Sequence, residues 1–205
     1  MYQYSTARTN LISAAGTRFV WREAGAEHEG IPVVCFSYLM STMDDWDPAV
    51  IDGLALRFHV YLFDNRGVGR SEGQTPSSIE EMAEDAFHFL QAMGLSRIFL
   101  LGFSMGGMVA QAFIAAHPEM VEKLILVGTG PSGTVFRDSY TIPLKETTAK
   151  AILRHRDPKY YFLFESTPEG KKQATAFLER LRTRKKDRDM QIRLTSPVLK
   201  AQIQA

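Results

Sequence analysis

Short apolar runs that alternate with longer amphipathic segments constrain the fold of this chain more than any other feature. Four nearly continuous apolar runs cover residues 31–36, 59–63, 98–101 and 123–127. A fifth stretch, residues 17–22, alternates in the manner of a half-exposed strand. Continuous apolar runs of this length are typical of strands that are buried on both faces of a parallel sheet.

Three amphipathic stretches between these runs predict helices over residues 46–56, 78–93 and 105–116. The second begins with Ser-Ile-Glu-Glu, a capping-box pattern, and Gly94 follows it as a stop signal. The alternation of strands and helices predicts an α/β fold, with a mostly parallel sheet and helices on both of its faces.

The pattern changes after Gly130, where strand-like runs stop. Helical patterns follow over residues 144–154, 158–164, 168–188 and 196–205. We therefore predict a sheet domain over residues 1–130 and a small helical domain over residues 131–205.

Composition points away from several classes of protein. The 205 residues carry a net charge of +1, so we expect no nucleic-acid partner and no anionic membrane surface as partner. No apolar run approaches the roughly 20 residues of a membrane helix, and residues 1–10 lack a signal-peptide pattern. With a single cysteine, Cys35, the chain fits a reducing compartment, and we expect it in the cytoplasm. The basic run at residues 180–188 lacks interleaved aromatic residues, which favours a solvent-facing helix side over a nucleic-acid site.

A Gly-x-Ser-x-Gly motif, centred on Ser104, lies between a predicted strand and a predicted helix. A strand that reverses into a helix within about two residues leaves the serine in a strained backbone conformation. Side chains two positions away would collide in such a turn, which explains Gly102 and Gly106. The serine hydroxyl would then stand at the positive end of the helix dipole.

Two further segments make a family resemblance plain. Residues 64–71, Asp-Asn-Arg-Gly-Val-Gly-Arg-Ser, resemble the loop that follows the fourth strand of α/β-hydrolases, and residues 44–48 resemble the segment that opens their first helix. The resemblance covers residues 15–130, while residues 131–205 resemble a helical cap in position and composition. It implies an α/β-hydrolase core with Ser104 as the nucleophile.

The resemblance also implies an oxyanion hole made of two backbone amides. One would belong to Met105, the residue after the nucleophile, and the other to Leu39 in the loop after the third strand. The family often has His-Gly-x in that loop, whereas this chain has Ser37-Tyr38-Leu39. A backbone donor does not depend on the side chain, so Leu39 remains the candidate.

The acid and base that the family places after the serine have no evident counterpart. His117 would lie about 20 Å along the same helix at 1.5 Å per residue, and His155 lies in a charged segment. We expect structural roles for the other histidines, His28, His59 and His88. The chain thus resembles a hydrolase that lacks its last strands and is weakly active or inactive as it stands. Its sheet would then be incomplete at the 123–127 strand, whose open edge predicts a homo-oligomer, coverage by residues 196–205 or a longer natural protein.

Two functions remain open from the sequence. The first is a serine hydrolase, without metal or organic cofactor, that acts on an ester, lactone or related carbonyl compound. An apolar cap favours a small apolar substrate for it, and the aromatic residues concerned are Tyr160, Tyr161, Phe162, Phe164 and Phe177. The second is a non-catalytic binding or interaction protein with a hydrolase fold.

Overall fold

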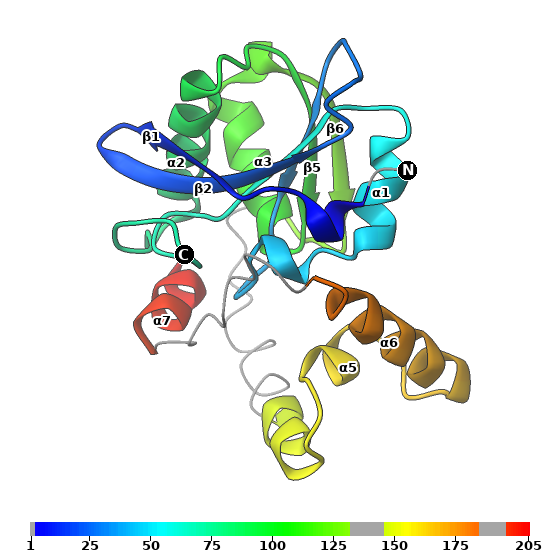
Figure 1. Ribbon diagram of the computed structural model, residues 1–205. Coiled ribbons are helices and arrows are strands. Elements are labelled where there is room, and N and C mark those ends of the chain that lie inside the picture. The colour runs from blue at the N-terminus through cyan, green and yellow to red at the C-terminus, as the bar shows by residue number, and fades with distance from the viewer. Residues whose placement is uncertain (1–2, 132–145, 185–195) are drawn as a thin grey trace. The chain divides into compact units, whose positions relative to one another are not determined.

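The structure is a computed structural model that describes residues 3–131, 146–184 and 196–205 (Figure 1). The chain divides into two compact units, one made of Met1–Thr134 with Arg184–Ala205 and the other of Val135–Thr183. Of the described residues near the C-terminus, Arg184 hydrogen-bonds to Ala7 and Gln202 hydrogen-bonds to Met40, both in the sheet unit.

A six-stranded sheet forms the first unit, in the order β1-β2-β4-β3-β5-β6. The strands are β1 (Asn10–Ala14), β2 (Thr17–Ala24), β3 (Val33–Phe36), β4 (Val60–Phe63), β5 (Ile98–Phe103) and β6 (Val121–Val127). β2 pairs antiparallel with β1 and β4, and the remaining pairs are parallel. The predicted α/β fold with a mostly parallel sheet is confirmed.

The sequence did not predict β1, which forms a hairpin with β2. The connecting residues Ala15 and Gly16 have φ values of 46° and 76°, and such left-handed pairs match the twist of a hairpin. Alanine is an uncommon residue in this position, and Leu11 in β1 is exposed. The usual signs of a hairpin were therefore absent from the sequence.

Helices cover both faces of the sheet, as predicted. They are α1 (Pro48–Ala55) on one face, and α2 (Ile79–Ala92) and α3 (Met105–Ala116) on the other (Figure 1). Asp47 caps α1 through the amide of Ala49, and Ser78 caps α2 through the amide of Glu81. A 3₁₀ turn, η2 (Met43–Asp45), precedes α1, which therefore begins two residues later than expected.

Two apolar cores follow from the alternation of side chains along the central strands. One lies under α2 and α3 and includes Phe36, Phe63 and Phe113. The other lies under α1 and includes Cys35 and Leu62. Because β3 and β4 are buried on both faces, the sheet holds the loops after its strands in fixed positions.

β6 forms one edge of the sheet. Its residues Ile125, Leu126 and Val127 are 43%, 43% and 44% exposed, although all three are apolar. Within the described ranges, no strand pairs with the outer side of β6.

The second unit contains a helix over residues 146–153, then α5 (Lys159–Phe162) and α6 (Pro168–Leu181). α6 ends at Leu181, earlier than the predicted end at Arg188, and the amide and hydroxyl of Thr183 both donate to the carbonyl of Arg180. α7 (Ser196–Gln204) belongs to the sheet unit. None of the helices in the described residues is both long and apolar enough to span a bilayer.

The basic run is not uniformly solvent-facing, which corrects the sequence interpretation. Arg184 is only 5% exposed, and its Nε lies 3.3 Å from the carboxylate of Asp44. Its guanidinium also donates to the carbonyl oxygens of Tyr4 and Ala7. Arg22, which is fully buried, donates to the same Asp44 carboxylate at 2.6 Å. Residues 185–188 of the run lie outside the described part of the chain.

Candidate active site

Ser104 lies alone between β5 and α3, with φ 53° and ψ −119°. A positive φ in a non-glycine residue is strained and persists only where the surroundings impose it. Phe103 is the last residue of β5 and Met105 the first of α3, so the chain reverses at this single residue.

Neighbouring glycines allow this reversal, because side chains at their positions would collide with backbone atoms. A Cβ on Gly102 would lie 2.6 Å from the carbonyl oxygen of Gly106. A Cβ on Gly106 would lie 2.7 Å from the carbonyl oxygen of Ser37 and closer still to that of Phe36. The first turn of α3 therefore packs directly on the end of β3.

Residues at and just after the end of β6 hold Ser104 in place through two hydrogen bonds. The amide of Ser104 donates to the carbonyl of Val127 at 2.9 Å, and the hydroxyl of Thr129 donates to the carbonyl of Ser104 at 2.7 Å. Gln111 of α3 donates to the carbonyl of Gly130 at 2.8 Å and fixes the same loop to the helix. These contacts have no local sign in the sequence, because Thr129 and Gln111 are ordinary residues in a loop and on a helix.

Met105, the first predicted oxyanion donor, is the first residue of α3. The first amides of a helix have no partner within the helix, and the helix dipole adds partial positive charge there. The Met105 side chain is buried in the core under α2 and α3, which fixes its backbone.

Leu39, the second predicted donor, lies in the loop that leaves β3. In the described part of the chain its amide makes no hydrogen bond, and its side chain packs against the same core as Met105. Because Gly106 packs against Phe36 and Ser37, this loop starts beside the first turn of α3.

Tyr38 takes the place where the family often has glycine, and the structure accommodates its side chain. Its ring centroid lies 5.0 Å from that of Phe103, and its hydroxyl is 3.4 Å from the carbonyl of Asp45. The left-handed residue of the loop is Met40, with φ 60°. Tyr38 does not need glycine's conformational freedom, because it is not among the residues with positive φ.

Several side chains hold the loop after β3 in place. Trp46 donates from its indole nitrogen to the hydroxyl of Ser37 at 2.9 Å. A capping box between Thr42 and Asp45 closes the turn that follows. The Asp64 carboxylate, at the start of the 64–71 loop, accepts from the amide of Met43 at 2.7 Å. The 64–71 loop therefore supports the loop of Leu39, and its Arg66 forms an ion pair with Asp85 of α2 at 2.7 Å.

The histidines of the sheet unit are engaged away from Ser104. His28 contacts the carbonyl of Ala55, and His59 pairs with Glu23. His117 stacks on Phe87 with ring centroids 3.8 Å apart. His88 follows Phe87 in α2, and His155 lies in the helical unit. Among the described residues, no group of three or more His, Cys, Asp or Glu side chains is arranged to hold a metal ion.

The predicted cap aromatics differ in their surroundings. The Tyr161 ring lies against that of Tyr160, with ring centroids 5.0 Å apart. Phe164 and Tyr160 pack against Phe177 and its apolar neighbours on α6, with the Phe164 and Phe177 rings 5.4 Å apart. Phe162 is 36% exposed.

Comparisons with known proteins agree with this fold. The profile of a family described as alpha/beta hydrolase fold matches residues 31–180. A solved alpha/beta hydrolase fold protein from Chitinophaga pinensis is 35% identical, with a TM-score of 0.86 over 99% of this chain and 72% of that chain.

Curated relatives are similar over shorter stretches. A protein of Caulobacter segnis, provisionally named carbamate hydrolase RutD, is 32% identical over 69% of this chain and 54% of that protein. The pimeloyl-acyl-carrier-protein methyl ester esterase of Edwardsiella ictaluri is 36% identical over 42% of this chain and 32% of that enzyme. The alignments thus span about a third to a half of the curated relatives.

Proposed function

Since the chain belongs to the alpha/beta hydrolase fold family, we propose that Ser104 is the nucleophile of a serine hydrolase. The observation that carries the proposal is the φ of 53° at Ser104, on a single residue between β5 and α3. Strain of this kind, held by glycines and by Thr129, is typical of residues that a fold positions for chemistry.

The proposed reaction is acyl transfer. The Ser104 oxygen attacks a carbonyl carbon, its proton passes to a base, and the carbonyl electrons move onto oxygen. The amides of Met105 and Leu39 would donate to that oxyanion, and removal of one such donor typically lowers kcat by about 10²–10³. The leaving group departs with a proton, and water then hydrolyses the acyl-serine.

An ester, lactone or related carbonyl compound is the substrate class that we propose, and the apolar residues of the helical unit favour a small apolar acyl or alcohol group. Relatives support the reaction type, because their names describe a carbamate hydrolase and a methyl ester esterase. Carbamates and esters share an acyl carbon that a serine can attack.

We expect slow turnover from the 205 residues alone. A serine without a base is a weak nucleophile, and the histidines of the sheet unit contact other residues. These contacts of the histidines also favour the second candidate function, a non-catalytic binding or interaction protein with a hydrolase fold.

A fluorophosphonate probe separates the two functions. Because we expect Ser104 to be only a weak nucleophile, we expect slow labelling, located on Ser104 by peptide mass spectrometry and absent from Ser104→Ala. The chain should hydrolyse a small chromogenic ester with a kcat well under about 1 per second, below the usual range of enzymes. This hydrolysis should be lost in Ser104→Ala. A folded protein whose Ser104 neither reacts with the probe nor supports hydrolysis above that of Ser104→Ala would favour the binding protein.

We also propose that the exposed edge of β6 pairs with a second copy of the chain. An exposed apolar edge strand presents unpaired backbone donors and acceptors to a partner. Light scattering should then give the mass of a dimer for the parent chain and of a monomer for Ile125→Lys. A monomeric parent chain would contradict the proposal.

A further inference from the structure

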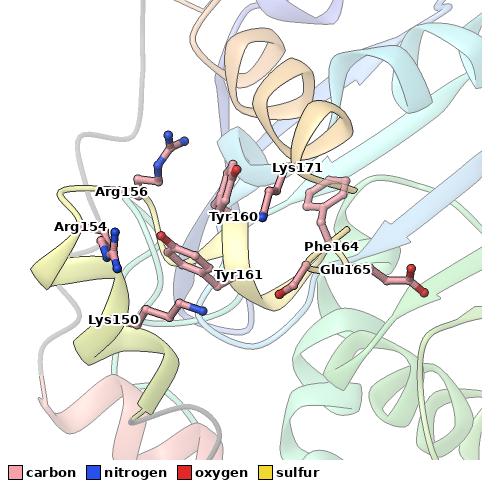
Figure 2. Close-up of a pocket in the computed structure, with 9 residues that line it drawn as sticks. Lys150, Arg154, Arg156, Tyr160, Tyr161, Phe164, Glu165 and Lys171 are labelled. Carbon is pink, nitrogen blue, oxygen red and sulfur yellow. The ribbon is translucent and has the colours of Figure 1, made fainter. Parts of the chain in front are cut away.

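The helical unit contains a pocket of about 360 Å³ that is rich in positive charge (Figure 2). Its lining includes four cations, Lys150, Arg154, Arg156 and Lys171, and one carboxylate, Glu165. Four positive charges and one negative charge give +3, whereas the whole chain carries only +1. This concentration of charge is absent from the sequence interpretation, which treated the region as an apolar cap.

The positive charges converge because of how the helix over residues 146–153 ends. His155 follows it with φ 50°, and the amide of Arg156 returns to the carbonyl of Ala151 at 2.9 Å. This is the pattern of a left-handed helix terminus. It reverses the chain within a few residues, so that Lys150, Arg154 and Arg156 all line the same pocket.

Two tyrosines of α5 orient the cations. The Lys150 ammonium lies 4.8 Å from the ring centroid of Tyr161, and the Arg156 guanidinium lies 4.5 Å from that of Tyr160. Figure 2 shows Lys150 beside Tyr161. In the described residues, none of the pocket's four cations forms an ion pair with a carboxylate. Cation–π contacts hold two of the four, Lys150 and Arg156, without neutralising their charge.

Residues around the start of α6 line another part of the pocket. Gly170 allows α6 to approach the carbonyl of Glu165 closely, where a Cβ would collide. Lys171, the next residue, thereby lines the pocket together with Ser166. Tyr160 and Phe164 are anchored on the apolar face of α6, which contains Phe177.

We propose that this pocket binds a small organic anion with at least two negative charges, such as a phosphate monoester or a polycarboxylate. Its volume suits a small molecule, because ligand sites commonly measure about 300–1,000 Å³. The cations supply charge-assisted hydrogen bonds, which are the strong ones in recognition of phosphate and carboxylate. Tyr160, Tyr161 and Phe164 line the same pocket, and their rings supply apolar surface for the organic part.

Lys171 and Lys172 offer a matched pair of variants, because both are exposed on α6 and only Lys171 lines the pocket. Calorimetric titration of the whole chain with phenyl phosphate and with citrate tests the proposal without any turnover. We expect a Kd below about 1 mM for at least one of them, an affinity of at least about −4 kcal/mol. Lys171→Gln should weaken binding about 3- to 10-fold, and Lys172→Gln less than about 2-fold.

Two results would overturn the proposal. One is the lack of binding by either probe, and the other is an equal loss in both lysine variants, which would indicate a diffuse charge effect. Inorganic phosphate tests the organic part, because binding as tight as that of phenyl phosphate would show that only the charge is recognised. Thermal unfolding of each variant checks that the helical unit stays folded. Since no step involves Ser104, a failure here leaves the proposed hydrolase function unaffected.

Discussion

The side-chain oxygen of Gln202 accepts a hydrogen bond from the amide of Met40 at 2.9 Å, across 162 residues of sequence. Gln202 is 5% exposed in α7, and Met40 holds a left-handed conformation next to Leu39. A buried partner for this amide stabilises a backbone conformation that is unfavourable for methionine. α7 thereby helps to fix the loop that carries the proposed second oxyanion donor.

Gln202→Ala should release this loop. We expect a loss of about 1 kcal/mol in the free energy of unfolding, the usual net value of one hydrogen bond. Amide exchange at Met40 should become faster. Gln204→Ala is the control, because Gln204 is exposed in the same helix. If the Met40 amide of Gln202→Ala exchanges at the parent rate, as we expect for Gln204→Ala, the hydrogen bond does not hold the loop.

Gly106→Ala should destabilise the sheet unit strongly. The added Cβ would collide with the backbone of Phe36 and Ser37, which cannot move without displacing β3. We expect a loss of about 3 kcal/mol or more in urea unfolding, in the range of severe core substitutions.

Gly53→Ala is the matched control, because a Cβ at Gly53 in α1 would meet nothing within 4 Å. That substitution should stabilise the protein by about 0.5–1 kcal/mol through helix propensity. Equal effects of the two substitutions would contradict the close packing of α3 on β3.

Arg184→Gln should be far more damaging than Arg182→Gln, although the two residues are two positions apart. Arg184 is buried against Asp44 and the carbonyls of Tyr4 and Ala7, whereas Arg182 is exposed after α6. Loss of a buried charge partner typically costs about 3 kcal/mol, and an exposed charge less than about 1 kcal/mol. Urea unfolding measures both, and similar losses would show that Arg184 is not part of a buried network.

The central strands and the helices over them were predictable because their signals are local. Residues 60–63 are apolar throughout, Ser78 precedes a helix with the right cap, and the glycines around Ser104 mark the turn. Each of these patterns can be recognised from a few neighbouring residues in the sequence.

Contacts between distant residues were not predictable from one sequence. Nothing near Arg184 distinguishes it from the other basic residues of its run, and its burial comes with contacts to the distant residues Tyr4, Ala7 and Asp44. The same holds for Thr129 beside Ser104 and for Gln202 beside Met40. The cationic pocket was missed because its charges come from separate segments, which the turn at His155 brings together.

Cys35 makes the stability of the sheet unit sensitive to alkaline pH. It is fully buried in β3, and burial raises the pKa of its thiol to about 12. The unfolded thiol has a pKa of about 8.5. Between these two values the folded state retains a proton that the unfolded state loses, so the contribution is complete below pH 8.5 and is lost as the pH rises towards 12.

Urea unfolding of the parent chain and of Cys35→Ala at pH 8, 9.5 and 10.5 tests this. The parent should lose up to about 1.4 kcal/mol per pH unit more than the variant above pH 9, the value for one proton. Cys35→Ala should be less stable at pH 8, because it leaves a small cavity, but its stability should fall less steeply. Burial also raises the pKa of Tyr4, whose hydroxyl donates to the carbonyl of Met43, so Tyr4→Phe should flatten the remaining slope at the highest pH. Parallel pH profiles for the parent and Cys35→Ala would show that the buried thiol does not contribute.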